Sequence, residues 1–74
     1  MPRTVEAPTL DAIRAAVVAV DAADVLSKDS ADAFHELAAL VGTVAAYRAR
    51  MRLRDGGVDA AVATAVKYSG LFGA

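Results

Sequence analysis

The sequence predicts an all-α fold, a three-helix antiparallel (up-down-up) bundle that follows a flexible N-terminal arm. Apolar residues recur with the helical period of 3.6 in three separate stretches. No stretch keeps the period-two alternation of a β-strand over more than a few residues. Seventy-four residues make one domain at most. We therefore expect a single helical domain over residues 9–74, with helices at about 10–26, 31–54 and 58–69.

The first helix follows an arm, residues 1–8, that contains both prolines and has no periodicity. Thr9 is the expected N-cap, because its side-chain oxygen can accept from an amide of the first turn. An apolar stripe then follows at helical spacing: Leu10, Ile13, Val17 and Val20. The pattern becomes irregular at residues 24–26, where we expect this helix to end.

The second helix has the most regular stripe in the chain. Asp29 and Ser30 are both suitable N-caps. Four apolar residues and one arginine recur along one line of this helix: Phe34, Leu37, Val41, Val44 and Arg48. Three more apolar residues lie beside that line: Leu40, Tyr47 and Met51. These side chains cover roughly 140° of a helix. The stripe predicts one long central helix over residues 31–54, with Val41 in the core and a stop at Asp55-Gly56-Gly57.

The third helix is predicted by its boundaries as much as by its stripe. Gly56-Gly57 gives a tight connection, and Asp59 places negative charge at the N-terminus. Gly70 is the expected C′ glycine, which ends the helix near Ser69. Such short connections favour antiparallel neighbours.

The composition predicts a thin core. The hydrophobic fraction is 57%, but it is made mainly of 19 Ala and 10 Val, with only 6 Leu and no Trp. Alanine offers little apolar surface to bury, and small scaffolds with thin cores usually need a disulfide, a metal or a partner. The chain has no Cys and one His, so we expect neither a disulfide nor a metal, and no cofactor. Association with another chain is the stabilising device that remains.

The charge is small overall but unevenly distributed. The net charge is −1, with −4 on residues 1–46 and +3 on residues 47–74. The overall value predicts neither nucleic-acid nor membrane binding, and the asymmetry favours head-to-tail or antiparallel pairing. The longest apolar stretch, residues 15–20, is far shorter than the roughly 18 residues of a membrane span. No secretory signal is evident, so we expect a small cytoplasmic protein. The abundant Ala, Val, Arg, Asp and Gly indicate a GC-rich genome. A small bacterial or phage protein is the expected origin.

Four arginines near the end of the predicted central helix are the candidate nucleic-acid contacts: Arg48, Arg50, Arg52 and Arg54. A basic patch of this kind can contact phosphates. At helical spacing, however, the four side chains point in different directions and do not form one face. The favoured interpretation is a solvated helix end whose cations complement the helix dipole. Residues 58–69 are too apolar for a recognition helix in a DNA groove.

The sequence contains no constellation that predicts an enzyme. His35 and Glu36 are neighbours on the polar side of the helix, and Asp32 is an ordinary surface partner three residues before His35. There is no Gly-rich phosphate loop, no Ser/His/Asp set and no metal-ligand spacing. We therefore expect no catalytic residues.

Alanine and valine occupy many positions that should face outward. The candidate interface residues are Val18 and Val25 on the first helix and Leu71 and Phe72 in the tail. A contiguous exposed apolar surface usually marks an interface, although alanine is also a neutral helix former. The leading hypothesis is a non-enzymatic helical interaction module, either self-associating as a homo-oligomer or an accessory subunit or adaptor within a larger complex. The alternative is a small nucleic-acid-associated regulator that uses the arginine cluster.

Overall fold

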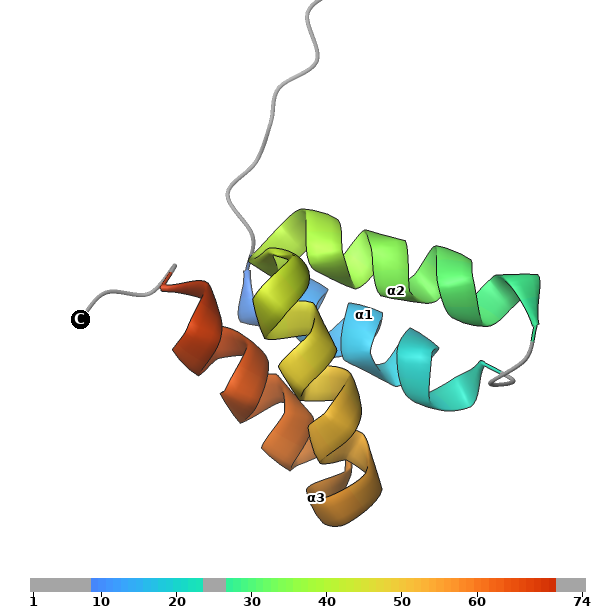
Figure 1. Ribbon diagram of the computed structural model, residues 1–74. Coiled ribbons are helices and arrows are strands. Elements are labelled where there is room, and N and C mark those ends of the chain that lie inside the picture. The colour runs from blue at the N-terminus through green and yellow to red at the C-terminus, as the bar shows by residue number, and fades with distance from the viewer. Residues whose placement is uncertain (1–8, 24–26, 71–74) are drawn as a thin grey trace, which may run out of the picture.

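A computed structural model of the chain describes residues 9–23 and 27–70 and contains three helices there: α1 (Leu10–Ala22), α2 (Lys28–Val41) and α3 (Thr43–Ser69) (Figure 1). The predicted all-α class with three helices is confirmed. The predicted arm, residues 1–8, lies outside the described residues, as do residues 24–26 and 71–74.

Helix α1 begins as predicted. The Thr9 hydroxyl oxygen accepts a hydrogen bond from the Ala12 amide at 3.1 Å. The helix ends at Ala22, earlier than the predicted residue 26, because Ala23 has an extended backbone (φ −76°, ψ 143°). The next two positions on the apolar stripe are Asp24 and Ser27, so a longer helix would bring no apolar side chain to the core.

Helix α2 begins at Lys28, before the predicted residue 31. Its N-cap is Ser27, whose hydroxyl oxygen accepts from the Ser30 amide at 3.3 Å. The prediction of Asp29 or Ser30 as the cap was wrong. Asp29 lies instead in the first turn, where its negative charge interacts favourably with the positive end of the helix dipole.

The predicted central helix over residues 31–54 is also wrong, because the chain leaves the helical conformation at Gly42. This residue has φ 93° and ψ 155°, a region that essentially only glycine occupies. The apolar pattern continues across Gly42, but the helix does not. Residues 43–54 therefore belong to a new helix with a different orientation (Figure 1).

Helix α3 is folded on itself. Gly57 has non-helical angles (φ 79°, ψ −169°) and divides the helix into a first arm, residues 43–56, and a second arm, residues 58–69. Figure 1 shows the two arms running in opposite directions. The turn lies at the predicted Gly56-Gly57, and Gly70 ends the second arm in the left-handed conformation, as predicted.

The core lies where all three helices meet. Figure 1 shows α1 and α2 running in opposite directions, with α3 lying across them. Thirteen apolar side chains are buried among the described residues, and seven of them are alanines. The largest that are fully buried are Ile13, Val17 and Leu37, all on α1 and α2. Helix α3 contributes five alanines and only one larger buried side chain, Val62, so the predicted thin core is present and is thinnest at α3.

Candidate functional site

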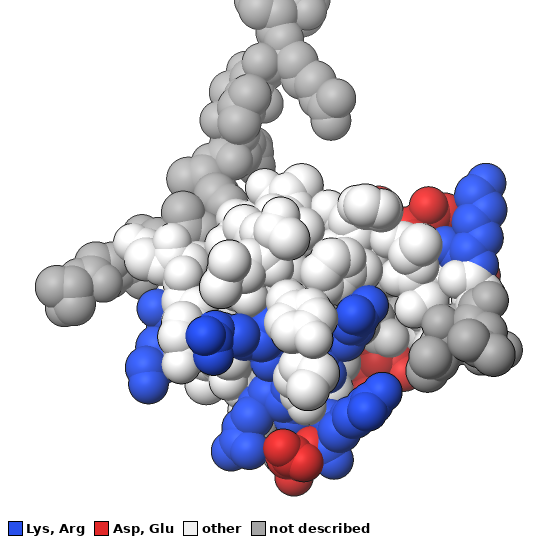
Figure 2. Space-filling model, viewed as in Figure 1, with Lys and Arg blue, Asp and Glu red and all other residues white. Residues whose placement is uncertain are grey.

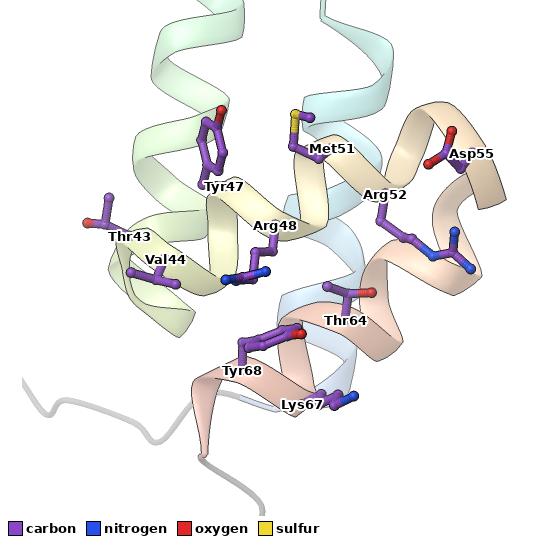
Figure 3. A pocket seen from close by; sticks show the side chains of 10 residues that line it. All are labelled: Thr43, Val44, Tyr47, Arg48, Met51, Arg52, Asp55, Thr64, Lys67 and Tyr68. Carbon is purple, nitrogen blue, oxygen red and sulfur yellow. The ribbon is translucent and has the colours of Figure 1, made fainter.

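A large concavity of the described surface lies along α3, between its two arms. It has a volume of about 760 Å³. Seven residues of the first arm and three of the second line it: Thr43, Val44, Tyr47, Arg48, Met51, Arg52, Asp55, Thr64, Lys67 and Tyr68. Figure 3 shows these side chains, with Arg48 and Tyr68 directed toward each other from opposite arms. We call this surface the α3 groove.

The α3 groove gathers most of the large apolar side chains that the described residues expose. Six such side chains are exposed, and four of them line the groove: Val44 (65% exposed), Tyr47 (51%), Met51 (49%) and Tyr68 (46%). Exposed apolar side chains scattered singly need no explanation, but a contiguous group is typical of a binding surface.

The break at Gly42 explains why these side chains face outward. On α2 the predicted apolar stripe faces the core, because Leu37 and Val41 are buried and Phe34 is half-buried. After the chain changes direction, the same stripe on the first arm turns to solvent. The arm instead buries a row of small residues, Ala45, Ala46 and Ala49. The apolar stripe alone does not reveal the groove residues, because it groups Val44, Tyr47 and Met51 with the core residue Val41.

Three cations and one carboxylate accompany the aromatic groups in the α3 groove. The guanidinium carbon of Arg48 lies 4.6 Å from the centroid of the Tyr68 ring, and the Lys67 ammonium lies 5.6 Å from the same centroid. Such contacts hold a cation at an aromatic face while leaving its charge available. Arg52 and Asp55 complete the charged lining. Figure 2 shows Lys and Arg side chains gathered around uncharged atoms on the part of the surface that α3 occupies.

The four arginines named by the sequence separate into two pairs. Arg48 and Arg52 line the α3 groove. Arg50 and Arg54 line a smaller depression of about 360 Å³ next to the end of α1. Arg50 also lies over the half-buried Phe34 ring, 4.6 Å from its centroid. As predicted, the four do not form one face, and the guanidinium of Arg50 lies over Phe34 at the edge of the core.

Of the predicted interface residues, only Val18 falls within the described part of the chain. It is 46% exposed on the outward side of α1 and does not line the α3 groove. Val25, Leu71 and Phe72 lie outside the described residues.

The described residues provide little of the geometry that acid–base or metal chemistry needs. His35, Glu36 and Asp32 are all exposed, and the His35 ring lies edge-on to that of its neighbour Phe34, with centroids 6.3 Å apart. Within residues 9–23 and 27–70, no three His, Cys, Asp or Glu side chains come together as metal ligands would. Every buried side chain in these ranges is apolar.

None of the helices described is both long and apolar enough to cross a membrane. Comparisons of the chain with known protein families, with curated proteins and with solved structures found no match.

Proposed function

We propose that this chain is a non-enzymatic protein-interaction module whose α3 groove binds a helix of another protein chain. The observation that carries the proposal is the gathering of four of the six exposed large apolar side chains in one groove. Tyr and Met are enriched where proteins bind each other, because both offer large contact areas. The three cations of the groove favour a partner that carries carboxylates beside its apolar side chains.

The dimensions of the groove suit a helix of three to four turns. Its longer wall runs from Thr43 to Asp55 along the first arm, a length of about 20 Å at the helical rise of 1.5 Å per residue. An amphipathic helix could place apolar side chains against Tyr47 and Met51 and its carboxylates near Arg48 and Arg52. This is the helix-in-groove mode of recognition.

A second candidate function is binding of single-stranded nucleic acid in the same groove. The observation that favours it is the alternation of Tyr47 and Tyr68 with Arg48, Arg52 and Lys67. Aromatic rings that stack on bases within a basic groove are typical of single-strand binding. The net charge of −1 and the carboxylate of Asp55 in the groove favour the protein partner instead.

One titration distinguishes the two candidates. The ¹⁵N-labelled chain is titrated with a synthetic amphipathic peptide of about four helical turns, bearing Leu and Glu on one face, and separately with an oligothymidine of similar length. We expect the peptide to shift the amide signals of residues 43–52 and 64–68. Tyr47→Ala and Met51→Ala should weaken its binding by roughly tenfold or more, as for central contact residues elsewhere.

The matched control is Val18→Ala, which truncates a comparably exposed side chain on α1 and should leave peptide binding unchanged. A peptide that shifts no groove signal contradicts the proposal. If only the oligothymidine binds, with an affinity that falls steeply with salt, the nucleic-acid function replaces it. If only Val18→Ala loses peptide binding, the binding surface lies on α1, where the sequence placed it, and not in the α3 groove.

A further inference from the structure

We infer that the partner chain is a second copy of this protein, which offers its α1–α2 surface to the α3 groove so that copies join head to tail. This inference rests on the proposed function, since it names the occupant of the same groove. The surface that would contact the groove lies between α1 and α2 and carries two shallow depressions of about 470 and 370 Å³. We call this surface the seam.

The seam is shaped to receive large side chains. Alanines of both helices line most of the two depressions, among them Ala15, Ala19 and Ala39. Small side chains let a partner approach the helix backbones closely. The first arm carries large exposed side chains along the α3 groove, namely Val44, Tyr47 and Met51. In a head-to-tail contact, these large side chains would pack against the alanines of the seam.

The charges of the two surfaces are also complementary. Glu36 lines both depressions of the seam, Asp29 and Asp32 line the smaller one, and no basic residue lines either. Across the described residues, α1 and α2 with their caps carry five acidic and two basic side chains, a net charge of −3. Helix α3 carries five basic and two acidic side chains, a net charge of +3.

This charge pattern favours the head-to-tail contact over a symmetric contact between two grooves. Two grooves facing each other would bring Arg48, Arg52 and Lys67 of one copy against the same cations of the other. Like charges placed opposite one another disfavour an interface. A groove that faces a seam instead places these cations opposite carboxylates.

The two surfaces cannot meet within one chain. No residue of α1 or α2 lines the α3 groove, and no residue of α3 lines either depression of the seam. A copy that uses its groove thus keeps its seam free for another copy. Head-to-tail contacts of this kind form a ring when the rotation between copies closes, and a filament when it does not.

Charge reversal of each surface tests the inference. One variant carries Arg48→Glu and Arg52→Glu in the groove, and the other carries Asp32→Lys and Glu36→Lys on the seam; all four side chains are exposed. Molar mass is followed by light scattering over a dilution series at low salt, with circular dichroism confirming the helical fold. We expect the unaltered chain to associate and each variant alone to associate more than about tenfold more weakly.

An equimolar mixture of the two variants should restore association, because each reversed surface then meets an opposite charge on the other variant. Val18→Asp, which changes α1 outside the seam, is the control and should associate as the unaltered chain does. If the seam variant alone associates normally, the contact does not involve the seam and the inference is wrong. A chain that stays monomeric but still binds the acidic peptide in its groove overturns the head-to-tail inference and leaves the proposed function standing. A chain that does neither overturns both.

Discussion

The α1–α2 pair and the folded helix α3 use large apolar side chains in opposite ways. In the α1–α2 pair, Ile13, Val17 and Leu37 are fully buried. In α3 the fully buried side chains are alanines, whereas Tyr47 and Met51 are about half exposed. The same classes of residue thus fill the interior in one region and cover the surface in the other.

This difference assigns separate tasks to the two regions. Burial of a Leu or Ile side chain contributes roughly 1.5–3 kcal/mol, far more than burial of an alanine methyl group. The α1–α2 pair therefore provides the largest fully buried side chains that stabilise the fold. The alanines of α3 bring its backbone close to the core and leave the larger side chains of that helix available for binding.

The strongest test of this difference is to place the same charge at one position before Gly42 and at one position after it. Val41→Asp puts an unpaired carboxylate at a buried position of α2, and such a charge costs several kcal/mol without a partner. We expect this variant to lose its helical circular dichroism at 25 °C. Val44→Asp is only three residues away but alters a side chain that is exposed in the α3 groove, so it should fold normally. Equal losses of helicity in the two variants would show that residues 31–54 form one continuous helix.

Truncation of large side chains gives the next largest effect. Leu37→Ala removes a fully buried side chain and should lower the free energy of unfolding in urea by about 2–5 kcal/mol. Met51→Ala removes a side chain of similar size from the groove and should change it by less than about 0.5 kcal/mol. If Met51→Ala costs as much as Leu37→Ala, α3 takes part in the core through this face and the groove is not a free surface.

The sequence was sufficient to predict the helical class, the Gly56-Gly57 turn and the end at Gly70, because each depends on a local pattern. It was insufficient at Gly42, where a single glycine lies within an uninterrupted apolar stripe. A glycine inside a helix is tolerated at a cost of roughly 1 kcal/mol, so its presence alone did not predict a break. The contacts that make the break favourable are tertiary: the first arm buries Ala45, Ala46 and Ala49.

Prediction of the α3 groove from the sequence was limited in the same way, because part of it depends on tertiary structure. Helical rotation of about 100° per residue brings residues four apart to nearly the same side, which pairs Arg48 with Arg52 and Arg50 with Arg54. The sequence could therefore separate the arginines into pairs. Which pair would share a groove with Tyr68 depended on the fold of α3 at Gly57, since Tyr68 and Arg48 lie on different arms.

A smaller effect is expected from the backbone at the boundary between the two regions. Gly42→Ala introduces a side chain into free space, because no heavy atom lies within 4 Å of the added Cβ. The cost comes from the φ of 93°, and residues forced into such regions lose about 1–3 kcal/mol. We expect a corresponding fall in the urea midpoint, whereas Thr43→Ala at the exposed neighbouring position should have little effect. A stabilised Gly42→Ala chain would mean that α2 continues through Gly42, since alanine favours a helix.

The smallest effect tests whether polar contacts help to join the two regions. Arg14 of α1 donates to Asp59 at the start of the second arm at 2.6 Å, but the two side chains are 53% and 85% exposed. Solvent screens exposed pairs, so Asp59→Asn should lower the free energy of unfolding by no more than about 0.2–1 kcal/mol. Because Asp59 also interacts with the helix dipole, a double-mutant cycle with Arg14→Gln isolates the pair itself. A coupling energy clearly above this range would make the ion pair, and not the alanine contacts, the main attachment of the second arm to α1. A coupling energy within it, lost in high salt, leaves apolar packing as the force that holds α3 against the α1–α2 pair.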